Sequence, residues 1–110
     1  MARRQWLSIL RLTRPAMHRD GPTEAEAAAL QGHVDYVKRL SQEGIIILVG
    51  RTQVDDEPMG IRIFYAEDES AARAQVAADP AVAGGVMRSE LFPYRVAWGN
   101  VESLREALEG

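Results

Sequence analysis

The chain has 110 residues, of which 46% are hydrophobic and 26% are charged, and its formal net charge is −3. This length forms one domain with a substantial core, and the acidic balance argues against a nucleic-acid surface, which needs clustered Lys and Arg. Since no apolar run approaches the roughly 18 residues of a membrane span, we expect a single cytoplasmic domain over residues 1–110.

The first predicted strand covers residues 6–14, WLSILRLTR, which are rich in apolar side chains and stop before a proline. Residues 15–22 contain two prolines and one glycine, a composition typical of a loop. His18 lies in this loop, where a solvated side chain is the simpler interpretation and a role in a lid is the alternative.

A long helix is predicted over residues 24–42. Thr23 is placed as its N-cap, and Glu26 three positions later completes a capping box. Gly44 stands where a left-handed C-terminal cap belongs. One face of the helix is apolar over an arc of about 160°, and His33 lies near the middle of this arc. The other members of the stripe are Leu30, Val34, Tyr36, Val37 and Leu40.

Two strands and a second helix follow. Residues 45–52 begin with IIILVG, an apolar run that predicts a strand buried on both faces. After a polar turn, IRIFYAE at 61–67 predicts the next strand. Residues 68–79 predict a helix, and Pro80 ends it because a proline ring cannot continue an α-helix there.

The remainder of the chain completes the pattern. AVAGG at 81–85 predicts a turn, because it lacks the Gly and Lys spacing of a phosphate-binding loop. Residues 86–98 predict the last strand, with Pro93 as a bulge or bend. Residues 100–109 predict a short C-terminal helix that is capped by Asn100.

The resulting order β-α-β-β-α-β is that of the ferredoxin-like α+β fold, with the C-terminal helix added as an extension. In this fold both helices cover one face of the sheet. The other face would then expose about half of IIILVG together with Phe64. Such an area is more apolar than a monomer usually exposes. We therefore expect a homodimer whose two sheets pack face to face.

Several features occur together in this sequence: the spacing of His33, Tyr36, Leu40 and Gly44, the apolar strand that ends at Gly50, the segment AADPAVAGG at 77–85, and GVMRSELFPYRVA after it. With these features, roughly residues 6–97 resemble the YciI-like (YCII-related) family. One departure is Arg51, which stands where many members have a proline after the second strand.

The resemblance implies a dimeric α/β barrel of ferredoxin-like subunits, with a pocket between the sheet and the helices. It also implies a dyad between a histidine on the first helix and the aspartate of the Asp-Pro pair, here His33 and Asp79. Most members have no established reaction. Some resemble enzymes that act on small cyclic or aromatic compounds, including by dehydrochlorination, and the fold recurs in lactone isomerases and cofactor-free oxygenases.

His33 and Asp79 are the leading candidate catalytic residues. A carboxylate that accepts from one ring nitrogen fixes the tautomer and raises the basicity of the other nitrogen, which suits proton abstraction from a small acidic substrate. Alternatively, His33 is a buried histidine whose hydrogen bonds are satisfied, and Asp79 forms the turn ahead of the glycines.

Arg51, Arg14 and Tyr36 are candidates for substrate binding. Each arginine lies at the end of a predicted strand and has a guanidinium fork that matches a carboxylate, although arginines at strand ends are commonly solvated. We expect the first two strands to be antiparallel to each other, so the two arginines need not be neighbours. Tyr36 offers a hydroxyl or a stacking face one turn from His33, or else it packs in the core with its hydroxyl at the edge.

The sequence leaves two function classes open. The first is a small cofactor-independent enzyme, a lyase or isomerase, that uses the His-Asp dyad on a small cyclic or carboxylated compound. The second is a non-catalytic small-molecule-binding or dimerisation module with a structural His33. The lack of cysteine excludes disulfides, and two distant histidines predict no metal site. The expected partners are a second copy and a small-molecule ligand, without nucleic acid or membrane.

Overall fold

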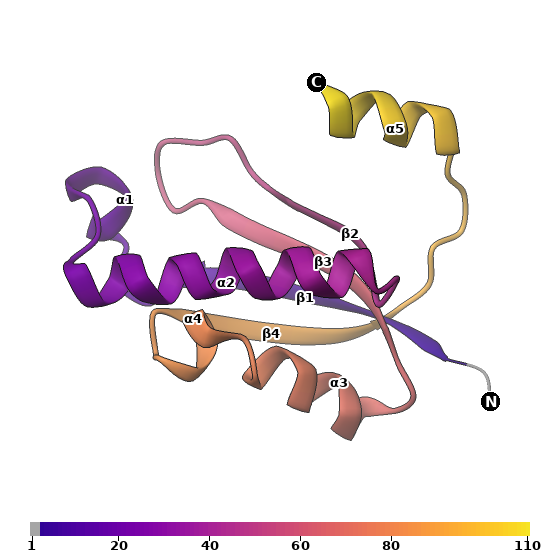
Figure 1. Ribbon diagram of the computed structural model, residues 1–110, viewed down its shortest axis with the longest axis horizontal. Helices are drawn as coiled ribbons and strands as arrows, with labels where there is room; N and C mark the ends of the chain where they lie inside the picture. The colour runs from indigo at the N-terminus through magenta and orange to yellow at the C-terminus, as the bar shows by residue number, and fades with distance from the viewer. Residues whose placement is uncertain (1–2) are drawn as a thin grey trace.

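The computed structural model describes residues 3–110, which form a four-stranded antiparallel sheet with helices packed on one face (Figure 1). The predicted mixed α+β class is confirmed. Within these residues, no helix is both long and apolar enough to cross a membrane. The strands are β1 (Arg4–Leu12), β2 (Ile46–Arg51), β3 (Met59–Ala66) and β4 (Met87–Tyr94). The helices are α1 (Ala16–Asp20), α2 (Glu24–Gln42), α3 (Glu69–Ala77), α4 (Pro80–Ala83) and α5 (Val101–Glu109).

The strand order in the sheet is β2-β3-β1-β4, and each strand is antiparallel to its neighbours. Because β3 lies between β1 and β2 and is antiparallel to both, β1 and β2 run in the same direction. The prediction that these two strands are antiparallel to each other is therefore wrong. The C-terminal ends of β1 and β2 lie at the same end of the sheet. Arg51 is the last residue of β2, and Arg14 follows shortly after β1.

Local signals place α2 at the predicted residues. The Thr23 hydroxyl accepts from the Glu26 N–H at 3.1 Å, and the Glu26 carboxylate accepts from the Thr23 N–H at 2.8 Å, so both halves of the capping box are present. Gly44 has a φ of 75°, the left-handed conformation expected of a glycine after a helix. Val37 and Leu40 are buried and fix the helix on the sheet.

The helix predicted over 68–79 is α3, which ends at Ala77, and a short helix that was not predicted, α4, follows from Pro80. Asp79, just beyond α3, caps the short helix α4 and accepts from the Ala81 N–H at 2.9 Å. Pro80 begins α4, because its fixed φ suits the first helical position and its missing N–H is not needed there. The prediction of a turn over 81–85 is therefore wrong for the residues that belong to α4.

Two further boundaries differ from the prediction. The expected loop over 15–22 contains the five-residue helix α1. The expected last strand over 86–98 ends at Tyr94, and Pro93 lies within the ladder rather than at a bulge, since β1 and β4 pair in continuous register. Because β4 is an edge strand, the missing N–H of a proline is tolerated on its outer side.

Alternate residues of β1 face the helices and form the centre of the core. Trp6, Ser8 and Leu10 are each exposed by 4% or less. Trp6 donates through Nε1 to the Ala66 carbonyl at 3.1 Å, so its polar edge is satisfied. Phe64 pairs with Trp6 on the same face and is 0% exposed, so the prediction that it lies on the open face is wrong. Burial of one such large side chain stabilises the fold by about 1.5–3 kcal/mol.

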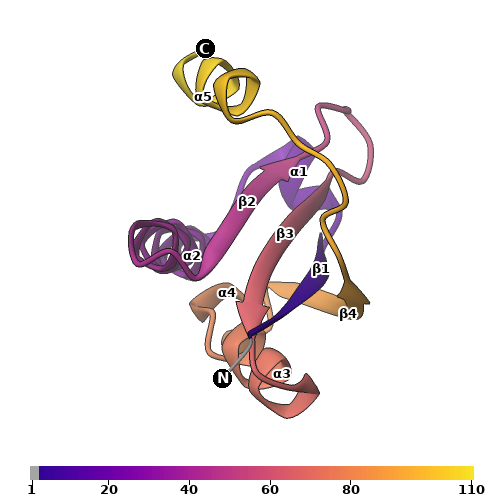
Figure 2. The same cartoon turned by 90° about the vertical axis from the view of Figure 1, so that its right-hand side faces the viewer.

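The opposite face of the sheet is apolar and partly exposed. Figure 2 looks along the sheet and shows α2, α3 and α4 on the same side. On the other face lie Leu48, Phe92 and Tyr94, which are 39%, 42% and 43% exposed. The position of β2 at the sheet edge also corrects the prediction that IIILVG is buried on both faces.

The C-terminal helix α5 stands apart from the sheet in both views (Figures 1 and 2). Asn100 caps it as predicted and accepts from the Ser103 N–H at 2.8 Å. None of its residues is buried against the described part of the chain, and Val101 and Leu108 are 73% and 74% exposed. A helix of this length is marginal in water by itself. The apolar stripe of α5, formed by Val101, Leu104 and Leu108, is therefore not covered by residues 3–110.

Candidate functional site

A buried aspartate is the centre of the candidate site. Asp79 is 0% exposed. Its Oδ1 accepts from the Ala81 N–H at 2.9 Å, and its Oδ2 accepts from His33 Nδ1 at 2.6 Å and from Arg62 Nη2 at 2.5 Å. The donors belong to α4, α2 and β3, so the carboxylate joins three elements. A buried carboxylate requires such partners to compensate its lost hydration.

These contacts keep the Asp79 carboxyl ionised. Burial by itself raises the pKa of this carboxyl, because it disfavours the charged form. The hydrogen bonds and charges of His33 and Arg62, with the N–H of Ala81, outweigh that effect, and the pKa of Asp79 lies below its ordinary value. At neutral pH the group therefore acts as a hydrogen-bond acceptor and orients its neighbours.

His33 lies between Asp79 and a cavity. An ionised carboxylate only accepts, so Nδ1 of the neutral ring carries the hydrogen and Nε2 carries a lone pair. The His33 side chain is 17% exposed, and it lines the cavity. The two side chains are in contact, as the resemblance implies, and a catalytic role for them stays a prediction.

A glycine within α2 allows Asp79 to approach His33. A Cβ atom at Gly32 would lie 2.8 Å from Pro80 Cβ and 3.1 Å from Pro80 Cγ. Glycine in a helix interior is less favourable than alanine by about 1 kcal/mol. Without a side chain at Gly32, α4 packs directly against α2, and Asp79 at the start of α4 reaches the ring of the next residue along α2.

Arg62, which lies on β3 and donates to Asp79, was not among the residues predicted from the sequence. It is 0% exposed, and its guanidinium lies 6.0 Å from the centre of the Tyr36 ring. Its Nε and Nη1 atoms have no hydrogen-bond partner among residues 3–110. The position of this arginine inside the apolar run IRIF could have indicated a buried charge. Strand alternation, however, does not tell which of the two apolar faces of the strand is covered by helices.

The cavity beside His33 has a volume of about 550 Å³ and lies between α1, α2 and the strands β1, β2 and β3. Its polar side chains are His33, His18 and Arg51. A volume of this order accommodates a small ring compound. The walls are otherwise mainly apolar and include Leu10, Met17, Leu30, Val49 and Ile61.

Of the three predicted substrate-binding residues, Arg51 lines this cavity. Arg14 is held instead by the Glu26 carboxylate. Tyr36 packs against the core cluster, and its hydroxyl donates to the Gln75 carbonyl at 2.6 Å. The geometry thus keeps Arg51 as a candidate for substrate binding, whereas the side chains of Arg14 and Tyr36 are engaged in structural contacts and do not line the cavity.

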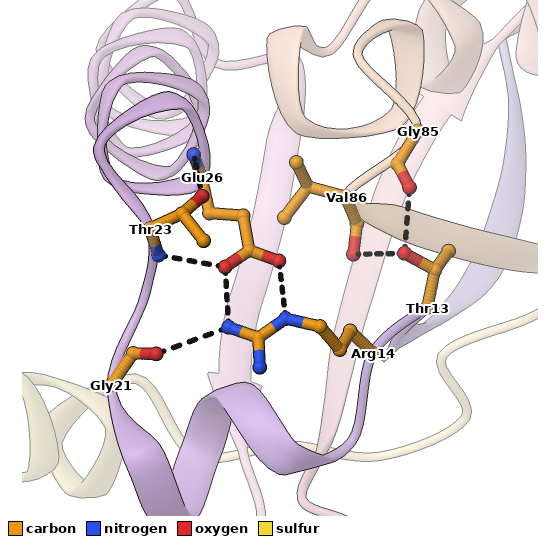
Figure 3. Close-up of polar contacts among 7 residues, drawn as sticks. All are labelled: Thr13, Arg14, Gly21, Thr23, Glu26, Gly85 and Val86. Carbon is orange, nitrogen blue, oxygen red and sulfur yellow. Dashed lines mark hydrogen bonds and ion pairs between the residues drawn. The ribbon is translucent and has the colours of Figure 1, made fainter.

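Arg14 fixes the segment that forms one wall of the cavity (Figure 3). Its guanidinium donates to both oxygens of Glu26, through Nε at 2.8 Å and Nη2 at 2.6 Å, and also to the Gly21 carbonyl at 3.1 Å. The hydrogen bond from Arg14 is the main reason that the pKa of Glu26 is lowered to about 2. The segment between Arg14 and Glu26 contains α1, which contributes Met17 and His18 to the cavity wall.

Residues 9–95 match the YCII-related domain family. The chain belongs to this family. A comparison with curated proteins finds no match. Membership in the YCII-related domain family agrees with the resemblance inferred from the spacing between His33 and Gly44 and from the segment at 77–85.

Among solved structures, the chain is similar to the 5-chloro-2-hydroxyhydroquinone dehydrochlorinase TftG from Burkholderia phenoliruptrix AC1100, in complex with 2,5-dihydroxybenzoquinone. The identity is 19% and the TM-score 0.60, over 84% of this chain and 95% of that one. It is also similar to the uncharacterized protein TM1266 from Thermotoga maritima, at 11% identity and a TM-score of 0.52, over 86% of this chain and all of that one (100%). At these identities the likeness establishes the fold.

Proposed function

We propose that this YCII-related protein is a small cofactor-independent enzyme that moves a proton on a small cyclic or carboxylated compound, with elimination or isomerisation as the result. The observation that carries the proposal is the setting of His33. One nitrogen of its ring is bound to a buried carboxylate, while the ring lines a mainly apolar cavity. This arrangement orients an unprotonated nitrogen toward bound substrate.

In the proposed step, Nε2 of His33 takes an acidic proton from the substrate, and the electron pair of the broken bond moves into an adjacent carbonyl as an enolate. Asp79 stabilises the imidazolium that forms, because its carboxylate already accepts from Nδ1. The enolate then expels a leaving group from the neighbouring carbon, or it takes the proton back at a different carbon. The first outcome is elimination and the second is isomerisation.

Arg51 supplies the binding charge in this proposal. It is exposed and lines the same cavity as His33, and a guanidinium fork binds a carboxylate or an enolate oxygen bidentately. The apolar walls favour a ring over an extended polar substrate. The likeness to TftG supports this substrate class, since that protein is a dehydrochlorinase of a hydroxylated ring and was solved with a dihydroxybenzoquinone.

The same proposal includes a homodimer, with the open sheet faces packed together as a dimeric α/β barrel. Support comes from the exposed apolar residues on that face and from the uncovered stripe of α5. Charge also bears on this packing. Arg11 and Arg88 pair across β1 and β4 on the open face, where Arg11 forms an ion pair with Glu90, and α5 carries three glutamates and one arginine. A partner's α5 would bring acidic side chains to Arg88.

Hydrogen–deuterium exchange tests the proposal without knowledge of the final product. The wild-type protein should accelerate exchange of ring hydrogens of 2,5-dihydroxybenzoquinone, or of small cyclic keto acids, into D₂O as followed by ¹H NMR. His33→Gln should lose this acceleration by about 10²-fold or more. Lys38→Gln, at an exposed position of the same helix and away from the cavity lining, is the matched control and should retain it. Binding of these compounds without exchange would favour the non-catalytic module instead.

A further inference from the structure

Arg62 is a charged side chain that the proposed chemistry does not touch. It lies in the middle of β3 on the helix-covered face and is 0% exposed. Its Nη2 donates to Asp79 Oδ2 at 2.5 Å, the same oxygen that accepts from His33 Nδ1 at 2.6 Å. An arginine stays protonated in proteins, so this is a permanent positive charge bound to the same carboxylate oxygen as the histidine.

We infer that Arg62 is a positioning residue that keeps the His33–Asp79 pair free of an extra proton at neutral pH, so that His33 is available as a base. A buried carboxylate beside an imidazole, with no other cation, retains a proton on the pair, because an uncompensated buried charge is unfavourable. Arg62 supplies the compensating charge permanently. The proton site on His33 Nε2 is then left empty for the substrate.

Polar atoms at and beside Arg62 have no partner among residues 3–110, which an ion pair that served stability alone would not require. The Nε and Nη1 atoms of Arg62 are unpaired within residues 3–110, and the hydroxyl of its cross-strand neighbour Ser8 is unpaired as well. Buried polar atoms without partners destabilise a fold. Replacement of a buried ion pair by apolar residues is often neutral or stabilising. An arginine retained under these conditions is consistent with a functional demand on Asp79.

The charged or titratable groups around His33 come from α1, α2, β2, β3 and the residue that precedes α4. Asp79 lies on the α4 side and Arg62 on the β3 side, and Tyr36 follows on α2 one turn later. Across the cavity are the side chains of His18 from α1 and Arg51 from β2. Arg62 bonds directly to the carboxylate oxygen that His33 uses, so its removal alters the charge of the pair most directly.

The test is an NMR pH titration of the His33 ring in the wild type, Arg62→Gln and Arg62→Lys. Both variants shorten the side chain, but only the glutamine removes the charge. Arg62→Gln should raise the titration midpoint of the His33–Asp79 pair by about one pH unit or more, a tenfold gain in proton affinity. Arg62→Lys should restore most of the wild-type curve, and His18 should titrate alike in all three proteins.

Two results would overturn the inference: an unchanged His33 curve in folded Arg62→Gln, or an equal shift in both variants, which would make side-chain length rather than charge decisive. If Arg62→Gln does not fold, Arg62→Met with Ser8→Ala removes the charge and the orphaned hydroxyl together, and the same shift is expected. This inference rests on the proposed function only for its use in catalysis. The titration requires no substrate, so its outcome is independent of the exchange assay.

A kinetic measurement connects the role of Arg62 with the proposed proton transfer by His33. Where exchange activity is present, the acid limb of its pH profile should move to higher pH in Arg62→Gln by the same interval as the His33 titration. A merely structural role would lower the rate at every pH and leave that limb in place.

Discussion

A methyl group added at Gly32 should separate His33 from Asp79 while α2 remains helical. A Cβ atom there would lie 2.8 Å from Pro80 Cβ, whereas non-bonded carbon atoms prefer about 3.5–4.0 Å. The helix α4 must therefore move away by roughly 1 Å. Asp79 directly precedes Pro80, so this movement lengthens the contact between His33 and Asp79 from 2.6 Å to about 3.6 Å, which is beyond hydrogen-bond range.

Two opposing terms set the stability of Gly32→Ala. Alanine in a helix interior gains about 1 kcal/mol over glycine. Loss of a hydrogen bond to a buried charged group removes about 1.5–3 kcal/mol. The net expectation is a destabilisation of about 0.5–2 kcal/mol. Ala28→Gly, at an exposed position of the same helix, is the matched control and should lose about 1 kcal/mol from helix propensity alone.

Urea unfolding of both variants measures these free energies, and the His33 NMR titration reports the contact. Gly32→Ala should weaken the influence of Asp79 on His33 and should move the curve part of the way toward that of Asp79→Asn. The reasoning would be refuted by a Gly32→Ala protein that is more stable than the wild type by about 1 kcal/mol with an unchanged His33 titration.

Three further predictions concern other parts of the molecule. The pKa of Glu26 lies at about 2 instead of 4.5. Its ion pair with Arg14 therefore stabilises the fold above about pH 4.5, and this contribution is lost as the pH falls toward 2. The thermal unfolding of Glu26→Gln should lack this part of the dependence on acid pH. Arg51→Gln should weaken binding of carboxylated ring compounds by about tenfold, measured by calorimetry, with uncharged analogues unaffected. Trp98 is 92% exposed. In the proposed dimer α5 docks on a second copy, so the fluorescence of Trp98 should shift to shorter wavelength as protein concentration rises, in a difference spectrum against Trp98→Phe. Leu104→Asp should abolish that shift and lower the mass seen by light scattering, whereas a shift that is independent of concentration would mean that the tail folds back on its own chain.

Local signals in the sequence were enough to place α2 and α5. Thr23 with Glu26, and Asn100, accept from backbone N–H groups within three residues, so their effect does not depend on the rest of the fold. The boundary between α3 and α4 was harder to predict. Asp79 and Pro80 are compatible with a turn after one helix and with the start of another helix. The close packing of Pro80 against Gly32 favours the second helix.

The face assignment of β3 could not be obtained from its sequence. A period of two places Arg62 and Phe64 on one face, with Ile61 and Ile63 on the other, and both faces carry large apolar residues. Helix packing covers the face that includes the arginine, so Phe64 is core and Arg62 becomes buried beside Asp79. A long-range contact of this kind depends on topology, and no local pattern encodes it.

The contact between His33 and Asp79 spans 46 positions of sequence. Helix periodicity indicated that His33 occupies an apolar stripe, but Asp79 was connected to it only through resemblance to a family. The structure supplies the physical reason: Asp79 caps α4, and Gly32 admits α4 against α2. The role of Arg51 depends on the parallel direction of β1 and β2, which brings both strand ends to one edge near the cavity.

The most direct test of the central claim is an NMR pH titration of the His33 ring in the wild type and in Asp79→Asn. If the two side chains act as a pair beside an accessible cavity, the wild-type ring titrates, and its midpoint falls when the aspartate loses its charge, because the imidazolium is no longer stabilised. A ring that does not titrate, or that gives the same curve in both proteins, would contradict the account.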